Sequence, residues 1–308
     1  MRTTETCHTV AFDWGTTHRR AYALDASGHC INEHADADGA LACKGRFPEA
    51  LASAMQAMNA TPKLVLMSGM VGSALGWKEV PYVSDDVPLT DLAQHLTEVA
   101  SPAGGPRPLI VPGYCVRDAF GQPDVMRGEE TQLLGAVTLG HATGWFVLPG
   151  THSKWVQLQE GRVRQLRTYM TGELFNLLGQ HGTLAAAIGA HTQDWDSAIF
   201  AEGVKAAANG SLSRALFGTR ARVVTGDMPA SHTKAYLSGL LIGTELHDVH
   251  RSADGTGDTG RFKLIGSPEL ATHYEAAAAL LGLNVEVLDA RAAFLSAMAY
   301  LQSELESA

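Results

Sequence analysis

The residues best suited to chemistry lie near the N-terminus, where Asp13–Thr17 (Asp-Trp-Gly-Thr-Thr) closes a short apolar run. A carboxylate at a strand end, followed by a glycine and two hydroxyls, provides the groups that a magnesium–nucleotide site needs. Gly15 lets the backbone approach phosphate oxygens, Thr16 and Thr17 donate hydrogen bonds, and Asp13 can hold the metal through water. Glycine and threonine are also common in hairpin turns, which is the competing interpretation of this stretch.

A second turn of the same kind begins at Gly150, again after an apolar run. When Gly15 and Gly150 are aligned, three further positions match in kind: Thr16 with Thr151, Thr17 with His152, and Arg19 with Lys154. Asp13 then falls on Leu148, so the second copy lacks the acid. Similarity at one long period predicts duplicated domains rather than a solenoid. Two matched turns, each followed by a cation, predict facing loops that hold a polyphosphate between the domains.

Residues 265–269 (Ile-Gly-Ser-Pro-Glu) are predicted to form a strand end, a glycine turn and a helix start. Ser267 is expected to cap the helix and Pro268 to occupy its first turn. Gly266 and Ser267 could let an adenosine lie against bare backbone. A β–α connection without any ligand explains the same residues.

Two adjacent acids, Glu129 and Glu130, open an expected helix that runs to about Leu139. Acids are favoured in a first helical turn by the helix dipole, so a capping role is the simpler interpretation. The same dipole keeps a carboxylate ionised, as a general base for a hydroxyl proton requires. With Arg127 beside them and the expected domain boundary nearby, these acids are the best candidates for the chemistry.

Composition sets limits on the possible functions. The chain has 308 residues, 45% of them hydrophobic and 18% charged, which fits two globular domains with their own cores. Its net charge of −9 and the lack of any Lys/Arg run argue against a nucleic-acid partner. No apolar run reaches the roughly 18 residues of a membrane span, and no signal peptide is expected. The 4 cysteines show neither C-x-x-C nor zinc-ligand spacing, and nothing favours the one conceivable bridge, Cys30–Cys43, which indicates reduced thiols in a cytoplasmic protein.

Each half continues with strands that alternate with helices, which predicts an α/β fold of mixed sheets flanked by helices. The expected helices cover residues 47–58, 90–100, 129–139, 171–180, 194–209, 233–248, 267–281 and 290 onward, and the later strands 63–67, 108–111, 262–265 and 284–288. The expected domains are 1–142 and 143–308. Small residues on helices 129–139 and 233–248 predict that these two helices cross closely. The run from Gly255 to Gly260 matches a dinucleotide pattern in the wrong structural context and is interpreted as a loop.

The ordered motifs of this chain resemble the 2-dehydro-3-deoxygalactonokinase family over nearly its whole length. The segments that carry the resemblance are Asp13–Thr17, Met67–Ser73 with Gly76–Lys78, Val111–Gly113, Met126–Gln132, Leu148–Trp155 and Met170–Leu174. The longer ones, MRGEETQ and PGTHSKWV, are specific, whereas short Gly-Thr turns are not.

The resemblance implies the actin/hexokinase/Hsp70 ATPase fold, with ATP in a cleft between two ribonuclease-H-like domains. It also implies ATP- and Mg²⁺-dependent phosphorylation of the 6-hydroxyl of 2-dehydro-3-deoxy-D-galactonate, a step of galactonate catabolism. Asp13 matches the first phosphate motif, Gly150–His152 the second, and Ile265–Ser267 the adenosine motif. Many relatives in the wider superfamily begin the second loop with an acid, and here that place is Leu148. Motif transfer therefore leaves the base unassigned between Glu129 and Glu130.

The substrate implied by the resemblance carries a carboxylate, so a neighbouring cation is expected. The substrate-binding candidates are Ser68, Gly69, Met70, Lys78, Arg127, Lys154 and Arg167. The alternatives are a kinase for another sugar or sugar acid, a phosphohydrolase and a non-catalytic nucleotide-binding module, and a homodimer is left open. The retained acids Glu129 and Glu130 favour an enzyme.

Overall fold

The computed structural model describes residues 6–101, 105–188, 195–253 and 260–307, and it divides into two compact units. The first unit contains Met1–Thr143, Val156–Leu166 and Asp289–Ala308, and the second contains Gly144–Trp155 and Arg167–Leu288. This division differs from the expected split at residues 142 and 143, because the tip of one hairpin and the C-terminal helix belong to the first unit. Residues 254–259, which hold most of the Gly255–Gly260 run, lie outside the described part.

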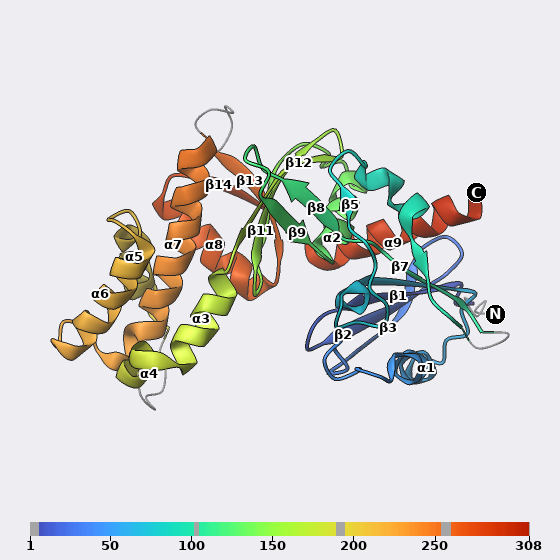
Figure 1. The fold of residues 1–308 in the computed structure, drawn as a ribbon, viewed down its shortest axis with the longest axis horizontal. Coiled ribbons are helices and arrows are strands. Elements are labelled where there is room, and N and C mark those ends of the chain that lie inside the picture. The colour runs from blue at the N-terminus through green and yellow to red at the C-terminus, as the bar shows by residue number, and fades with distance from the viewer. Residues whose placement is uncertain (1–5, 102–104, 189–194, 254–259, 308) are drawn as a thin grey trace. The chain divides into compact units, whose positions relative to one another are not determined.

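The first unit is built on a six-stranded sheet with the order β3-β2-β1-β4-β7-β6 (Figure 1). Its strands are β1 (Thr9–Trp14), β2 (Arg19–Leu24), β3 (Cys30–Asp36), β4 (Leu64–Gly69), β6 (Thr97–Glu98) and β7 (Arg107–Ile110). β1 pairs antiparallel with β2 and parallel with β4, so Asp13 lies opposite Ser68 at the carboxyl ends of two parallel strands. Every residue of β1 except Asp13 is buried.

Helix α1 (Phe47–Ala57) covers this sheet with a buried face formed by Phe47, Ala50, Leu51 and Ala54. The expected helix over 90–100 is a 3₁₀ helix, η2 (Leu89–His95), followed by the short strand β6. The two leucines Leu89 and Leu92 are fully buried at a spacing of three, which matches the three residues per turn of a 3₁₀ helix. A separate three-stranded sheet joins β5 (Val83–Ser84), β8 (Tyr114–Arg117) and β9 (Pro123–Met126).

Helices α2 (Glu129–Thr138) and α9 (Ala290–Ser307) cross closely within the first unit. Gly135 makes the contact possible, because a Cβ there would lie 1.7 Å from the carbonyl oxygen of Ala293. This contact is the physical reason why the C-terminal helix belongs to the first unit.

A second sheet, most of which belongs to the second unit, repeats the strand order of the first. It has five strands in the order β12-β11-β10-β13-β14, which are β10 (Gly144–Leu148), β11 (Ser153–Gln159), β12 (Arg162–Tyr169), β13 (Arg261–Gly266) and β14 (Asn284–Asp289). In both sheets the first strand is flanked by its hairpin partner on one side and by a parallel strand on the other, here β13. The expected duplication and the mixed α/β fold class are therefore confirmed.

The helices described for the second unit are α3 (Thr171–Gln180), α4 (Gly182–Ile188), α5 (Ser197–Ala206), α6 (Leu212–Val224), α7 (Thr233–Ala253) and α8 (Pro268–Leu280), with the 3₁₀ helix η3 (Ala230–His232). The small residues of α7 contact α5: a Cβ on Gly239 would lie 2.0 Å from the Phe200 carbonyl oxygen. The small residues of the predicted helices 129–139 and 233–248 thus each permit close packing against a helix of the same unit. None of the described helices meets the length and hydropathy that a membrane span requires.

Candidate functional site

The first glycine–threonine turn is tight and open to solvent. The Gly15 N–H donates to the His18 carbonyl at 2.9 Å, and Thr16 and Thr17 are exposed. Asp13 precedes the turn with its side chain 31% exposed and with Arg20 Nη1 at 3.8 Å from its Oδ2. Burial raises the pKa of Asp13, and the charge of Arg20 opposes that rise. The turn therefore presents hydroxyls beside one carboxylate, as predicted.

Arg19, the cation that follows this turn, makes its hydrogen bonds inside the first unit. Arg19 is 1% exposed, donates to Asp36 through Nε and Nη2 at 3.2 and 2.5 Å, and donates to the Ala50 carbonyl at 2.8 Å. Its guanidinium also lies 4.8 Å from the Trp14 ring centroid. Arg19 therefore has no donor group left for a ligand, because its guanidinium nitrogens already bond inside the protein.

Glu130 lies fully buried at the start of α2. Its carboxyl accepts from the Gly128 N–H at 2.7 and 2.9 Å, and the hydroxyls of Ser68 and Thr131 are 3.5 and 3.4 Å from its Oε1. These two hydroxyls bond mainly to each other, at 2.5 Å. Burial, with the nearby charge of Glu129, raises the pKa of Glu130 to about 8. A neutral carboxyl therefore predominates at pH 7.

Glu129 precedes it and is only partly buried. Its Oε2 accepts from the Arg127 N–H at 2.9 Å, so each glutamate caps a backbone N–H before the helix. Gly128 adopts φ +110°, and a Cβ there would lie 3.3 Å from the Gly69 Cα. Gly69 has φ +95° and approaches the Trp14 carbonyl in the same way. Two glycines thus bring the start of α2 against the ends of β4 and β1.

The predicted sugar-acid residues of the first unit lie around this junction. Ser68 is buried, Gly69 ends β4, and Met70 opens the 3₁₀ helix η1 (Met70–Gly72). Lys78 already makes one hydrogen bond within the protein, because its Nζ donates to the Glu98 carbonyl at 3.0 Å.

Arg127 links the start of α2 to the loop that follows η1. Its Nη2 donates to the Val80 carbonyl at 2.7 Å, and its guanidinium lies 4.3 Å from the Tyr82 ring centroid. Nε and Nη1 are buried and find no partner among the described residues. Such unsatisfied donors are rare in native proteins.

The remaining two candidates, Lys154 and Arg167, belong to the second unit. Lys154 is 6% exposed, and its Nζ donates to Thr168 Oγ1 at 3.0 Å. The Arg167 guanidinium lies 5.4 Å from the Trp145 ring centroid.

The second glycine–threonine turn follows β10 and is joined to the start of α3. The Glu173 N–H donates to the Thr151 carbonyl at 2.8 Å, and Glu173 Oε2 lies 2.6 Å from His152 Nε2. A Cβ on Gly172 would lie 2.3 Å from the Gly150 carbonyl oxygen. The turn and the helix start are thus in direct contact.

The Gly266–Ser267 turn lies beside the second glycine–threonine turn, at the end of the strand that pairs with β10. A Cβ on Gly266 would lie 3.2 Å from Pro149 Cδ. Ser267 is the N-cap of α8, its Oγ accepts from the Leu270 N–H at 3.4 Å, and Pro268 lies in the first turn, as predicted.

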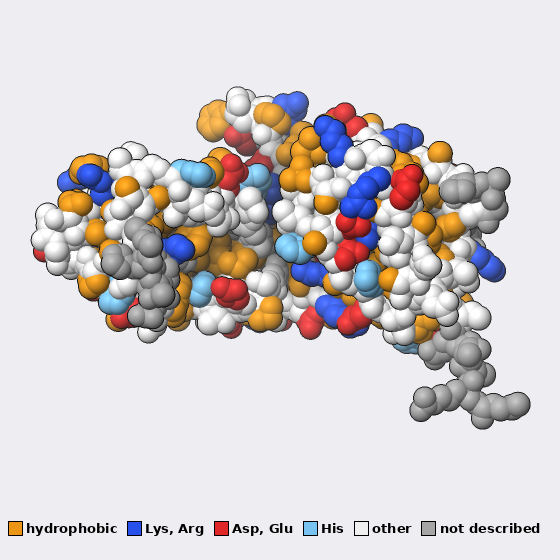
Figure 2. Space-filling view, turned by 90° about the horizontal axis from the view of Figure 1, so that it is seen from below, with side chains coloured by type: hydrophobic (Ala, Val, Ile, Leu, Met, Phe, Trp, Pro, Cys, Tyr) orange, Lys and Arg blue, Asp and Glu red, His pale blue; other side chains and the backbone are white. Residues whose placement is uncertain are grey.

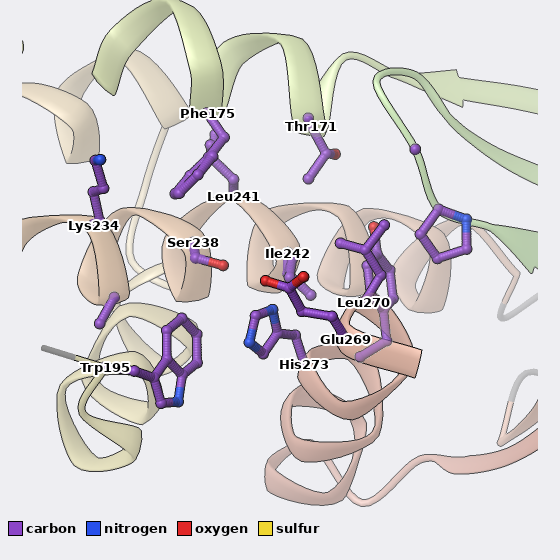
Figure 3. Close-up of a pocket in the computed structure, with 15 residues that line it drawn as sticks. Thr171, Phe175, Trp195, Lys234, Ser238, Leu241, Ile242, Glu269, Leu270 and His273 are labelled. Atoms are coloured by element: carbon purple, nitrogen blue, oxygen red, sulfur yellow. The ribbon is translucent and has the colours of Figure 1, made fainter. Parts of the chain in front are cut away.

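A cavity of about 360 Å³ opens next to these two turns within the second unit (Figure 3). Helices α3, α7 and α8 provide most of its walls, and it is lined by Pro149, Gly150, Thr171, Gly172, Phe175, Trp195, Lys234, Ala235, Ser238, Leu241, Ile242, Glu269, Leu270, His273 and Tyr274. Figure 2 shows hydrophobic side chains gathered around a hollow in the surface of this helical part. Its volume suits a small organic ligand.

Aromatic and charged side chains give this cavity its character, and sequence reasoning missed them. The Trp195 and His273 rings stack at 4.1 Å with an interplanar angle of 15°. In Figure 3 the Glu269 carboxylate points into the cavity near Ser238 and His273. Glu269 and His273 share α8, but Ser238 comes from α7 and Trp195 from the segment before α5, so no local sequence signal could have grouped all four.

Beneath the cavity, Glu245 of α7 joins three elements through a buried hydrogen-bond network. Its carboxyl accepts from Ser153 Oγ at 2.7 Å, Trp155 Nε1 at 2.5 Å, Thr171 Oγ1 at 2.5 Å and the Tyr274 hydroxyl at 2.9 Å. Burial raises the pKa of Glu245, and these bonds oppose the rise. Sequence reasoning missed Glu245 as well, although an acid flanked by Leu241, Ile242 and Leu246 in this helix was a usable signal.

Comparison with known proteins places the chain in a family. A family model described as 2-keto-3-deoxy-galactonokinase matches residues 13–301. The chain is 37% identical to a probable 2-dehydro-3-deoxygalactonokinase of Rhizobium meliloti (91% of this chain, 92% of that protein). It is 34% identical to the 2-dehydro-3-deoxygalactonokinase of Escherichia coli K12 (94% and 95%).

A crystal structure of a putative 2-dehydro-3-deoxygalactonokinase from Sinorhizobium meliloti superposes with a TM-score of 0.85 at 35% identity, covering 97% of this chain and 96% of that chain. The resemblance drawn from the sequence motifs is therefore confirmed, and the chain belongs to the 2-keto-3-deoxy-galactonokinase family.

Proposed function

We propose that this protein is an ATP-dependent kinase that phosphorylates the 6-hydroxyl of 2-dehydro-3-deoxy-D-galactonate in galactonate catabolism. The observation that carries the proposal is the cavity of the second unit, which opens beside two glycine turns at the ends of β10 and β13. An apolar cavity that leads to bare backbone N–H groups suits a nucleoside followed by phosphates. Membership in the 2-keto-3-deoxy-galactonokinase family supports 2-dehydro-3-deoxy-D-galactonate as the phosphate acceptor.

In this proposal the nucleoside occupies the cavity and its phosphates meet the Gly150–His152 turn. Gly266 and Ser267 border the adenosine, and the Gly15–Thr17 turn is proposed to bind the terminal phosphates, with the exposed Thr16 and Thr17 hydroxyls as donors. Little covalent work falls to a protein in phosphoryl transfer, so positioning and neutralisation of charge provide most of the rate enhancement.

The proposed Mg²⁺ would be held by Asp13 through water. Among the described residues no three His, Cys, Asp or Glu side chains cluster as a metal site, which fits an ion carried mainly by phosphates and one carboxylate. When bound, Mg²⁺ supplies neutralisation of phosphate charge. Asp13→Ala should lower kcat/KM at least 100-fold without changing the melting temperature, and unchanged kinetics would remove Asp13 from the metal site.

The proposed base is one of the two glutamates of α2, and exposure favours Glu129. A base must contact the hydroxyl whose proton it accepts. Glu129 is partly exposed, whereas Glu130 has no exposed surface and carries a proton at pH 7. Glu130 stays the second candidate.

The acceptor's carboxylate requires a cation, for which Arg127, Lys78, Lys154 and Arg167 are the candidates. Arg127 is favoured because two of its buried donors have no partner among the described residues. Ser68, Gly69 and Met70 are proposed to line the same acceptor site. All four cysteines are free, which supports a reducing, cytoplasmic location.

The test is a coupled ADP assay over a panel of 2-keto-3-deoxy sugar acids. ADP release that depends strictly on the galactonate-derived acid is the expected result. Dependence on another sugar acid would favour a different kinase of this fold. ADP release without any acceptor would indicate a phosphohydrolase, and nucleotide binding with no turnover would indicate a binding module.

A further inference from the structure

The second glycine–threonine turn is held by Glu173, the third residue of α3. Glu173 binds the turn twice, through its N–H to the Thr151 carbonyl at 2.8 Å and through its carboxylate at 2.6 Å from His152 Nε2. Gly172 permits this approach, because a Cβ at that position would collide with the Gly150 carbonyl. The start of α3 therefore fixes both the backbone of the turn and its histidine ring.

The geometry also fixes which nitrogen of His152 is available. A carboxylate oxygen can only accept, so His152 Nε2 carries a hydrogen and donates to Glu173. The opposite nitrogen, Nδ1, has no hydrogen-bond partner in the part of the chain that the structure describes. The His152 side chain is 46% exposed, so a ligand can reach this free nitrogen.

Charge near the turn points to the class of ligand. Lys154 is buried and bonded to Thr168, so His152 is the basic side chain of residues 149–154 that reaches the surface. Gly150 and Gly172 line the cavity, which places the His152–Glu173 pair next to the end of the cavity where the glycine turn lies. A ligand group at that end contacts backbone donors and the imidazole together, a combination suited to an anion.

We propose that Glu173 is a positioning residue that orients His152 so that Nδ1–H of the doubly protonated ring donates to the terminal phosphates of the donor nucleotide. The inference rests on the proposed function, since it takes the cavity ligand to be a nucleotide. It assigns Glu173 a role in phosphate binding through His152 rather than in contact with the nucleoside. Loss of this pair should therefore weaken binding only of ligands that carry terminal phosphates.

The experiment compares adenosine, ADP and a non-hydrolysable ATP analogue by isothermal titration calorimetry. His152→Ala and Glu173→Ala should each weaken the ATP analogue about tenfold, close to the value of one charge-assisted hydrogen bond, and leave adenosine within twofold. Glu173→Gln should recover much of the affinity, because its amide oxygen still accepts from Nε2. Glu275→Ala, an exposed acid on α8, is the matched control and should change nothing.

An equal loss of adenosine and ATP-analogue affinity in Glu173→Ala would mean that Glu173 has a purely structural role. That result would overturn this inference but not the proposed function. Unchanged affinity for all three ligands in His152→Ala would also overturn it, and this exposed variant remains informative if Glu173→Ala does not fold. A wild-type protein that binds none of the three ligands would overturn the proposed function and the inference with it.

Discussion

Glu130, at the start of α2 in the first unit, and Glu245, midway along α7 in the second, are both buried glutamates, but their partners differ. Glu245 accepts from four side chains at 2.5–2.9 Å. Glu130 accepts from a single backbone N–H at close range, and its hydroxyl neighbours lie at 3.4 and 3.5 Å. Burial raises the pKa of both; side-chain hydrogen bonds oppose the rise at Glu245, whereas at Glu130 the charge of Glu129 adds to it and backbone hydrogen bonds oppose it.

The difference shows how two buried acids can have separate uses. Four donors fix Glu245 in place, so it joins β11, α3 and α8 beneath the cavity of the second unit as part of the scaffold. Glu130 has too few hydrogen-bond donors around it to stay ionised at neutral pH, so its carboxyl holds a proton instead. Its proton therefore responds to pH near neutrality, next to the acid proposed as the base.

The largest expected effect is on stability, from removal of the Glu245 carboxylate. Glu245→Ala leaves four buried donors without their acceptor and should destabilise the second unit by roughly 3–5 kcal/mol. Glu130→Ala leaves one N–H unpaired and should cost roughly 1–3 kcal/mol. Urea denaturation followed by tryptophan fluorescence measures both, with Glu275→Ala as a control within about 0.5 kcal/mol. A smaller cost for Glu245→Ala than for Glu130→Ala would contradict the comparison.

The second prediction concerns the pH dependence of stability. The pKa of Glu130 rises from 4.5 to about 8 on folding, so the folded state holds this proton more tightly than the unfolded state. Its contribution is complete below pH 4.5 and is lost as the pH rises through 8. Between pH 5.5 and 8 the wild type should lose about 3 kcal/mol relative to Glu130→Gln, which cannot titrate.

Urea unfolding of both proteins at four pH values in this range gives the result. Parallel stability curves would mean that Glu130 stays ionised in the folded protein. The contrast with Glu245 would then disappear.

The repeated fold could be predicted from the sequence because the signals for its strands, turns and helix caps lie in neighbouring residues. Gly15 and Gly150 each follow an apolar strand, and Ser267 with Pro268 marks a helix start, so strand, turn and cap could be read from neighbouring residues. The roles of Arg19 and Glu130 could not be read in this way. Their burial depends on Asp36, Ser68 and other residues that only the folded sheet brings near.

The cavity was beyond sequence reasoning for the same reason. Trp195, Lys234 and His273 lie on different parts of the second unit and share no spacing. Glu245 differs, since an acid flanked by Leu241, Ile242 and Leu246 indicates a buried network even without coordinates. Its partners, however, come from three other elements.

The smallest expected effect separates the two glutamates in catalysis. At pH 7 Glu130 is mostly protonated, and a glutamine has nearly the same shape and hydrogen-bonding groups, so Glu130→Gln should lower kcat less than tenfold. Glu129→Gln removes the partly exposed carboxylate and should lower kcat about 100-fold, or 2.7 kcal/mol. Both glutamines keep an oxygen that accepts from the N–H groups of Arg127 and Gly128, so helix capping is preserved. Steady-state kinetics at pH 7 decide between them: a larger loss for Glu130→Gln would make the buried acid the base and would require it to become exposed when the acceptor binds.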